Sequence, residues 1–133
     1  MNYILDTSAI IDILRGKEAA ERFISEHIDD TFSTSCICEA EVAEGVYREK
    51  KEDIPARREQ MKKVFSSFYR VLPFDSDQAN IAGRIRAELG RAGTMIDDLD
   101  ILIAAAAVNL QASIVTKNPK HFSRVKNLQV ISI

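Results

Sequence analysis

The sequence predicts one α/β domain, a three-layer α/β/α sandwich with a central parallel sheet of about five short strands. Two features predict this fold class. Short apolar segments of strand length alternate with longer segments of helical apolar spacing, which is typical of parallel strands joined by helical crossovers. No repeat, low-complexity tract or linker rich in proline and glycine divides the 133 residues, so we expect a single domain over residues 1–133.

The chain opens with a strand and two helices. The apolar run "NYIL" is the first strand, and it ends at Asp6. Thr7 or Ser8 is expected to cap a helix that stops at Gly16, because short hydroxyl side chains cap helices and glycine ends them. A second helix is expected over about residues 17–28.

The middle of the chain continues this alternation. "TFSTS" at residues 31–35 is predicted to be a strand, followed by a helix that reaches about Tyr47. Pro55 suits the first position of a helix that extends to about Tyr69. "RVLPF" is then a brief strand, and Pro73 favours the edge of the sheet because it cannot donate a backbone hydrogen bond.

Two helices and two strands are expected in the last third. A capping-box pattern at Asp75 opens a helix ended by Gly90 and Gly93, and "TMIDDLDILIAAAA" opens another that reaches about Leu110. "SIVT" is predicted to be a buried strand and "LQVIS" the last strand. The Asn-Pro pair at 118–119 begins a short turn or helix between them.

Composition limits the class of protein. Hydrophobic residues make up 46% of the chain and charged residues 29%, which is typical of a soluble globular domain. The longest apolar run, "ILIAAAAV", is far shorter than the roughly 20 residues that span a bilayer, and the N-terminus lacks the basic start of a signal peptide. Cys36 and Cys38 are too few for a disulfide framework or a zinc site. We therefore expect a cytoplasmic protein with free thiols and no membrane association.

Charge is unevenly distributed along the chain, although the net charge is only −2. Residues 1–47 carry three basic and ten acidic side chains, whereas residues 48–133 carry fifteen basic and ten acidic ones. Basic residues concentrate in segments 48–70 and 117–126. Such runs are usually solvated faces, but together they are suited to attract a polyanion.

Acidic residues fall where parallel sheets bind ligands, beyond the carboxyl ends of strands. Asp6 follows the first strand, and the hydroxyl residues after it make an acid unnecessary for capping. A carboxylate buried at that point requires a cation or several hydrogen-bond donors. Glu39, Glu41 and Glu44 share the start of one helix, and their spacing alone does not choose among them.

Three aspartates open the apolar helix near residue 97. Thr94 and Asp97 match a capping box, and Asp98 is turned by about 100° toward water. The residues after Asp100 are apolar on every face, which predicts a buried helix. Asp97 and Asp100 would point the same way, and only Asp100 lacks a helix-starting role. His121 is interpreted as a surface residue, because no metal-ligand spacing joins it to the other histidine.

Four blocks of the sequence together resemble the PIN-domain family of nucleases, and most closely its small VapC-type ribonuclease toxins. The blocks are "LDTSAIIDIL", "SCICEAEVAEG", "GTMIDDLDILIAAAA" and "IVTKNPKHF". They occur in the family's order and span nearly the whole chain, so together they are far more specific than any one alone. The resemblance implies a single PIN domain.

The resemblance also implies an acidic site. It selects Glu41 from the three glutamates, because this residue stands four before Gly45. The implied catalytic residues are Asp6, Glu41 and Asp100, and the implied metal ligands are Asp6, Glu41, Asp97, Asp100 and Asn118. Two residues depart from the pattern: Ser8 stands where asparagine is usual, and His121 stands where an acid often precedes the phenylalanine.

The activity that this resemblance implies is hydrolysis of RNA phosphodiester bonds with Mg²⁺ or Mn²⁺, ions that prefer hard oxygen ligands. Asp6 and Asp100 would hold the principal ion, and Glu41 would help activate the nucleophile or seat a second ion. The implied partners are RNA, a small VapB-like antitoxin and a second copy of the chain in a homodimer. The basic residues expected to contact RNA are Arg84, Arg86, Arg91, Lys117 and Lys120.

Two other aspartate-centred α/β folds are discounted. Haloacid-dehalogenase-like enzymes need an aspartate where Ser8 stands. Receiver domains need an acid pair, a mid-chain phosphoacceptor aspartate and a late lysine, and only Lys117 fits this pattern. The alternative from another class is a catalytically silent PIN-like module that binds a partner protein or RNA.

Overall fold

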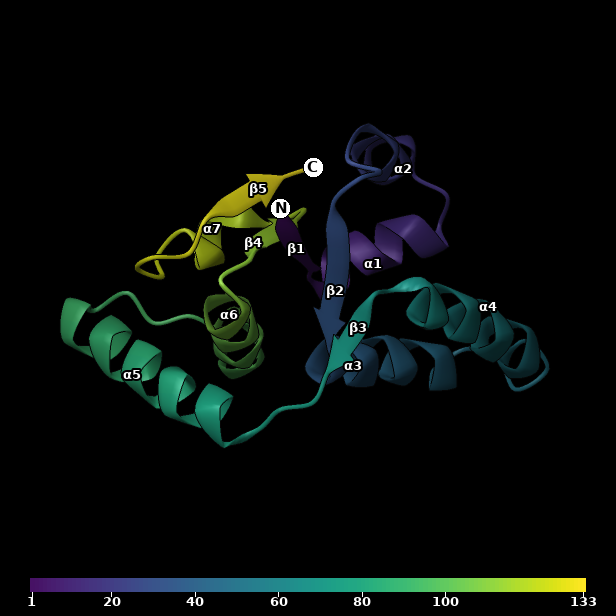
Figure 1. Cartoon of the computed structure of the whole chain (residues 1–133). Coiled ribbons are helices and arrows are strands. Elements are labelled where there is room, and N and C mark those ends of the chain that lie inside the picture. Colours follow the sequence, from purple (N-terminus) through teal and green to yellow (C-terminus); the bar gives the residue numbers. More distant parts are fainter.

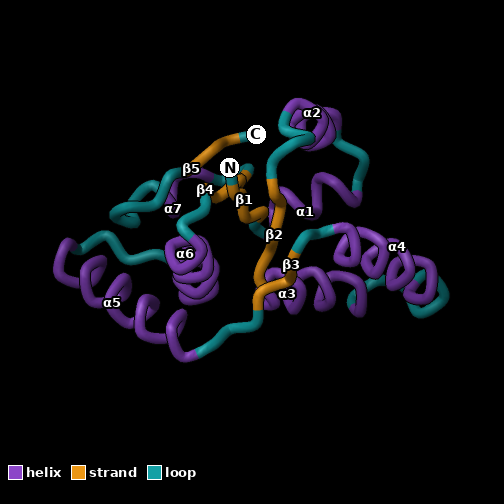
Figure 2. Tube along the Cα trace, in the orientation of Figure 1, coloured by secondary structure: helices purple, strands orange, loops and turns teal.

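The computed structural model describes residues 1–133 and contains a five-stranded sheet with seven helices (Figures 1 and 2). The strands are β1 (Asn2–Leu5), β2 (Thr31–Ser35), β3 (Arg70–Leu72), β4 (Ser113–Thr116) and β5 (Val130–Ser132). The helices are α1 (Thr7–Leu14), α2 (Glu18–Glu26), α3 (Cys36–Tyr47), α4 (Ile54–Ser67), α5 (Ser76–Ala92), α6 (Asp98–Leu110) and α7 (Pro119–Phe122).

The sheet is parallel throughout, with the strand order β3-β2-β1-β4-β5. In Figure 1, helices α1 to α4 lie on the right-hand side, next to β1 and β2, and α5 and α6 lie below β4 and β5. The predicted α/β/α fold with about five parallel strands is therefore confirmed. The strand predicted in "RVLPF" lies at the edge of the sheet as β3, but it ends at Leu72, before Pro73.

The central strands are the most deeply buried part of the sheet. Ile4 of β1 pairs with Ile114 of β4, and both side chains are completely buried. Because β1 and β4 are neighbours and parallel, their carboxyl ends meet at one edge of the sheet, although more than 100 residues separate them in the chain. The residues that follow these two strands are thus brought together.

Helix α6 packs against both the sheet and α5. Its buried positions include four consecutive alanines, Ala104 to Ala107, which are all fully buried. Small side chains let helix and sheet backbones approach closely, so the apolar run fits a helix covered on several sides. The expectation of a buried α6 is confirmed. No helix of the chain is both long and apolar enough to cross a membrane.

Several helix ends differ from the sequence prediction. Asp6, rather than Thr7 or Ser8, caps α1, because its carboxylate accepts the backbone N–H of Ala9 at 3.0 Å. Helix α5 continues through Gly90 and ends at Gly93, whose φ of +67° lies in the left-handed region that suits glycine.

The start of α6 also differs. The helix begins at Asp98, so the predicted capping box of Thr94 with Asp97 does not form. The backbone N–H of Thr94 instead donates to the carbonyl of Leu89 and closes the end of α5. Asp97 is the N-cap residue of α6, but its side chain makes no capping hydrogen bond.

Candidate metal and nuclease site

Asp6 lies at the carboxyl end of β1 and is only 5% exposed. Its Oδ1 accepts hydrogen bonds from the Ser8 hydroxyl at 2.7 Å and from the Ala9 backbone at 3.0 Å. Its Oδ2 accepts from the Thr116 hydroxyl at 2.6 Å. Burial raises the pKa of Asp6, the three donors oppose that rise, and the charge of Asp100 adds to it. Asp6 and Asp100 are therefore close enough to sense each other's charge.

Ser8 joins the loops that follow β1 and β4. Its hydroxyl donates to Asp6 and accepts the backbone N–H of Lys117 at 2.9 Å, so one side chain fastens both loops. Thr116 acts similarly, because it donates to Asp6 and accepts the backbone N–H of Asn118 at 3.0 Å. The single hydroxyl of Ser8 thus both donates and accepts in this network.

Glu41 is the acid of α3 that lies beside this network. Its Oε1 accepts a hydrogen bond of 2.6 Å from the hydroxyl of Thr7, the residue next to Asp6. Glu44 is exposed and forms an ion pair with Arg48. Of these two glutamates, only Glu41 contacts the residues around Asp6.

A second group of potential ligands lies at the start of α6. Asp97, Asp100 and His121 each offer one ligand atom, and these atoms all lie within 4.8 Å of one another. Asp6 and Glu41 are outside this group. Asp98 is exposed and forms an ion pair with Arg86, so it faces solvent as expected. Oxygen-rich, partly exposed donors of this kind fit a hard divalent cation.

The interpretation of His121 as a surface residue left out a contact that the structure shows. The side chain is half-buried, and its Nδ1 lies 3.1 Å from Oδ2 of Asp100. One feature of the sequence indicated the contact between His121 and Asp100: His121 stands where the family pattern often has an acid. Asn118 precedes α7 at the N-cap position, but its exposed side chain makes no capping bond.

The five basic residues expected to contact RNA do not form one surface. Lys117 binds the buried carboxylate of Asp12 at 3.3 Å, and Arg86 is paired with Asp98. Arg84 lies near Ser113, at the amino end of β4 and thus at the opposite edge of the sheet from Asp6.

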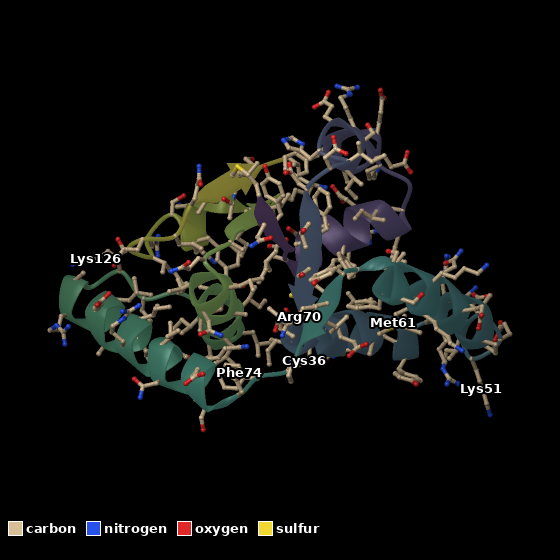
Figure 3. All side chains as sticks on the ribbon, in the orientation of Figure 1. Cys36, Lys51, Met61, Arg70, Phe74 and Lys126 are labelled. Carbon is tan, nitrogen blue, oxygen red and sulfur yellow. The ribbon has the colours of Figure 1, made fainter.

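Arg91 and Lys120 are exposed, and neither forms an ion pair. Lys51 of the first basic segment and Lys126 of the second lie at opposite ends of the view in Figure 3.

A groove of about 230 Å³ lies between α1, α3 and α4. Glu41 lies on its wall, so the groove adjoins the acidic site. The residues that line it are Ile11, Leu14, Arg15, Glu41, Val42, Gly45, Val46, Glu49, Arg57 and Gln60. Four of these residues are apolar, and Arg57 forms an ion pair of 3.9 Å with Glu49.

Comparison with known proteins gives a consistent result. The family model described as PIN domain matches residues 3–128. The tRNA(fMet)-specific endonuclease VapC of Shigella flexneri is 32% identical over 129 residues, which cover 97% of this chain and 96% of that protein. Ribonuclease VapC1 of Rickettsia felis is 30% identical over 133 residues, which cover 100% of this chain and 97% of that protein.

Solved structures agree with these relatives. The structure of VapBC2 from Rickettsia felis bound to a DNA fragment from its promoter contains a chain with a TM-score of 0.88 and 26% identity. That match covers 100% of this chain and 99% of the other. FitAcB from Neisseria gonorrhoeae matches with a TM-score of 0.82 and 25% identity, over 97% of this chain and 96% of that one.

Proposed function

Because the chain belongs to the PIN domain family, we propose that it is a divalent-metal-dependent endoribonuclease and the toxin of a VapBC-type toxin–antitoxin pair. The observation that carries the proposal is the group of Asp97, Asp100 and His121, whose potential ligand atoms all lie within 4.8 Å of one another. Carboxylates gathered in this way repel each other unless a cation compensates their charge.

The donor set fits a divalent cation. Asp6 and Asp100 are the proposed principal ligands, and Asp97, Glu41 and Asn118 complete the set, with Mg²⁺ or Mn²⁺ as the ion. A bound cation of this kind neutralises charge on the phosphate and makes water a stronger nucleophile at neutral pH. Mg²⁺ usually keeps several waters and takes only one or two carboxylates, so not all five residues need to contact one ion.

The other residues hold this arrangement in place. Ser8 and Thr116 donate to Asp6 and fix its two oxygens in different directions. Thr7 orients Glu41 from the other side. Glu41 is positioned by this bond to accept a proton from an attacking water or to seat a second ion.

The proposed partners follow from the comparisons and the surface. An RNA substrate would reach the site over Arg91 and Lys120, the two candidate basic residues that are free of ion pairs. Lys117, Arg86 and Arg84 are retained as weaker candidates, because each has an acidic neighbour. We place a VapB-like antitoxin segment in the groove beside Glu41, and we expect a homodimeric cytoplasmic toxin.

The test is cleavage of RNA by purified protein with and without Mg²⁺ or Mn²⁺. Wild type should cleave only with metal, and Asp6→Asn should reduce the rate at least about a hundredfold, because it removes a ligand charge while keeping the side-chain shape. Cleavage that survives in Asp6→Asn would come from a contaminant and would favour a catalytically silent binding module. Sequencing of RNA ends after brief expression in cells would then identify the target.

A further inference from the structure

The group at the start of α6 mixes oxygen and nitrogen donors. Asp97 and Asp100 offer carboxylate oxygens, and His121 offers an imidazole nitrogen from the separate helix α7. Asp97 is the N-cap residue of α6 without a capping bond, so its oxygens are available to a ligand. The three ligand atoms lie within 4.8 Å of one another.

The imidazole is held in this place by the packing of its neighbours. Phe122, the next residue, is 1% exposed and anchors α7 in the core. Arg124 donates to the backbone carbonyl of Met95 at 3.1 Å and ties the end of α7 to the loop before α6. The way α7 is anchored therefore places His121 beside Asp100.

We propose that His121 is a nitrogen ligand of the metal ion, and that it makes the site prefer first-row transition ions over Mg²⁺. This inference rests on the proposed function, which places a divalent cation beside Asp100. Mg²⁺ strongly prefers oxygen ligands, whereas affinity for sites that contain imidazole rises from Mn²⁺ toward Co²⁺. Replacing an acid by His121 therefore lowers the negative charge that attracts Mg²⁺ and adds a donor that transition ions bind well.

A competing role for His121 is that of a positioning residue. Carboxylate ligands are often hydrogen-bonded by side chains that do not touch the metal, and His121 already lies within hydrogen-bond distance of Asp100. The two roles differ in one observable: only a ligand transfers electron spin density from a paramagnetic ion to its own nitrogen.

The experiment uses Mn²⁺ as the probe in the full chain. Pulsed electron paramagnetic resonance should show a ¹⁴N coupling to bound Mn²⁺ in wild type. The coupling should disappear in His121→Glu, which supplies an oxygen ligand instead. The chain has only two histidines, so His27→Gln is the matched control. His27 stacks on Phe23 and lies outside the ligand group, so its variant should keep the coupling.

Dissociation constants give a second readout. Mn²⁺ is titrated directly and Mg²⁺ by competition. His121→Glu should lower the preference for Mn²⁺ over Mg²⁺ about tenfold, and it should weaken Co²⁺ binding more than Mn²⁺ binding.

Failure of this inference is distinguishable from failure of the proposed function. If Asp100→Asn abolishes Mn²⁺ binding but wild type shows no ¹⁴N coupling, or if His121→Glu leaves the metal preference unchanged, the metal site stands and nitrogen ligation is refuted. If wild type binds no Mn²⁺, both proposals fall. Nitrogen ligation in a protein that cleaves no RNA would support the ligand assignment and refute the proposed activity.

Discussion

Asp100 and Asp98 provide a matched pair for testing where the metal binds. Both are acids in the first turn of α6, so replacing either by asparagine removes a similar favourable interaction with the helix dipole. Only Asp100 belongs to the group of potential ligands, whereas Asp98 is exposed and paired with Arg86. We expect divalent metal to stabilise wild type and Asp98→Asn, but not Asp100→Asn.

The size of the effect follows from linkage between binding and folding. An ion present at a hundred times its dissociation constant adds about 2.7 kcal/mol to the free energy of unfolding. At roughly 2.1 cal/mol/K per residue, a chain of 133 residues has an unfolding entropy of about 0.28 kcal/mol/K, so the expected rise in Tm is about 10 °C.

Differential scanning calorimetry with and without Mn²⁺ measures this rise directly. Each variant serves as its own metal-free reference, so any change in its basal stability cancels. Equal metal-dependent shifts in wild type and Asp100→Asn would show that the ion binds elsewhere and would refute the site assignment. Loss of the shift in Asp98→Asn would point instead to a general effect of charge at the head of α6.

Three further predictions concern buried charge, thiol reactivity and backbone conformation. Burial raises the pKa of Asp6 above its ordinary value of 3.8, so the folded metal-free protein holds this proton more tightly than the unfolded chain does. The folded state therefore loses stability as pH rises from the ordinary pKa to the raised pKa. Asp6→Asn should raise the metal-free Tm at pH 7, and a lower Tm would contradict this. Burial raises the pKa of the Cys38 thiol to about 12, so alkylation at pH 8 followed by mass spectrometry should modify only the half-buried Cys36 in the native protein, and both thiols after unfolding. Gly83→Ala in α5 should stabilise the protein by about 1 kcal/mol in urea unfolding, since its Cβ meets no atom within 4 Å. Gly93→Ala should destabilise it by about 1 kcal/mol because of the positive φ, and equal effects of the two changes would refute the conformational argument.

Much of the fold was predictable because its signals are local. The apolar run of β4, the glycine that ends α5 and the proline that begins α7 each act within a few residues. Errors occurred at helix starts, where several residues compete for the same role. At α6 the sequence predicts a capping box that starts at Thr94. The backbone N–H of Thr94 instead donates to the carbonyl of Leu89 in α5, and α6 begins only at Asp98.

The site was predictable to the extent that burial could be inferred. Asp6 follows a central strand and Asp100 heads an apolar helix, so both carboxylates were expected to be desolvated. Glu41 needed the family resemblance, because spacing alone did not separate it from its neighbours. His121 was missed because its contact with Asp100 depends on how α7 docks against α6, which no local pattern reveals.

The ion pairs of the basic side chains could not be predicted from the sequence either. Lys117 was expected to be free for RNA, but it neutralises the buried Asp12 from 105 residues away. Arg86 was likewise paired with Asp98 across 12 residues. Counts of basic residues in a segment therefore overstated the charge that is available to a polyanion.

The bond between Asp6 and Thr116 also bears on when the protein becomes active during its synthesis. Thr116 follows Asp6 by 110 residues in the chain, so it leaves the ribosome later. Until β4 pairs with β1, the carboxylate has lost neither its water nor its freedom to rotate. A chain that cleaves RNA would therefore have no ordered Asp6 before β4 has been synthesised. The pairing of β4 with β1 would set the earliest moment of cleavage.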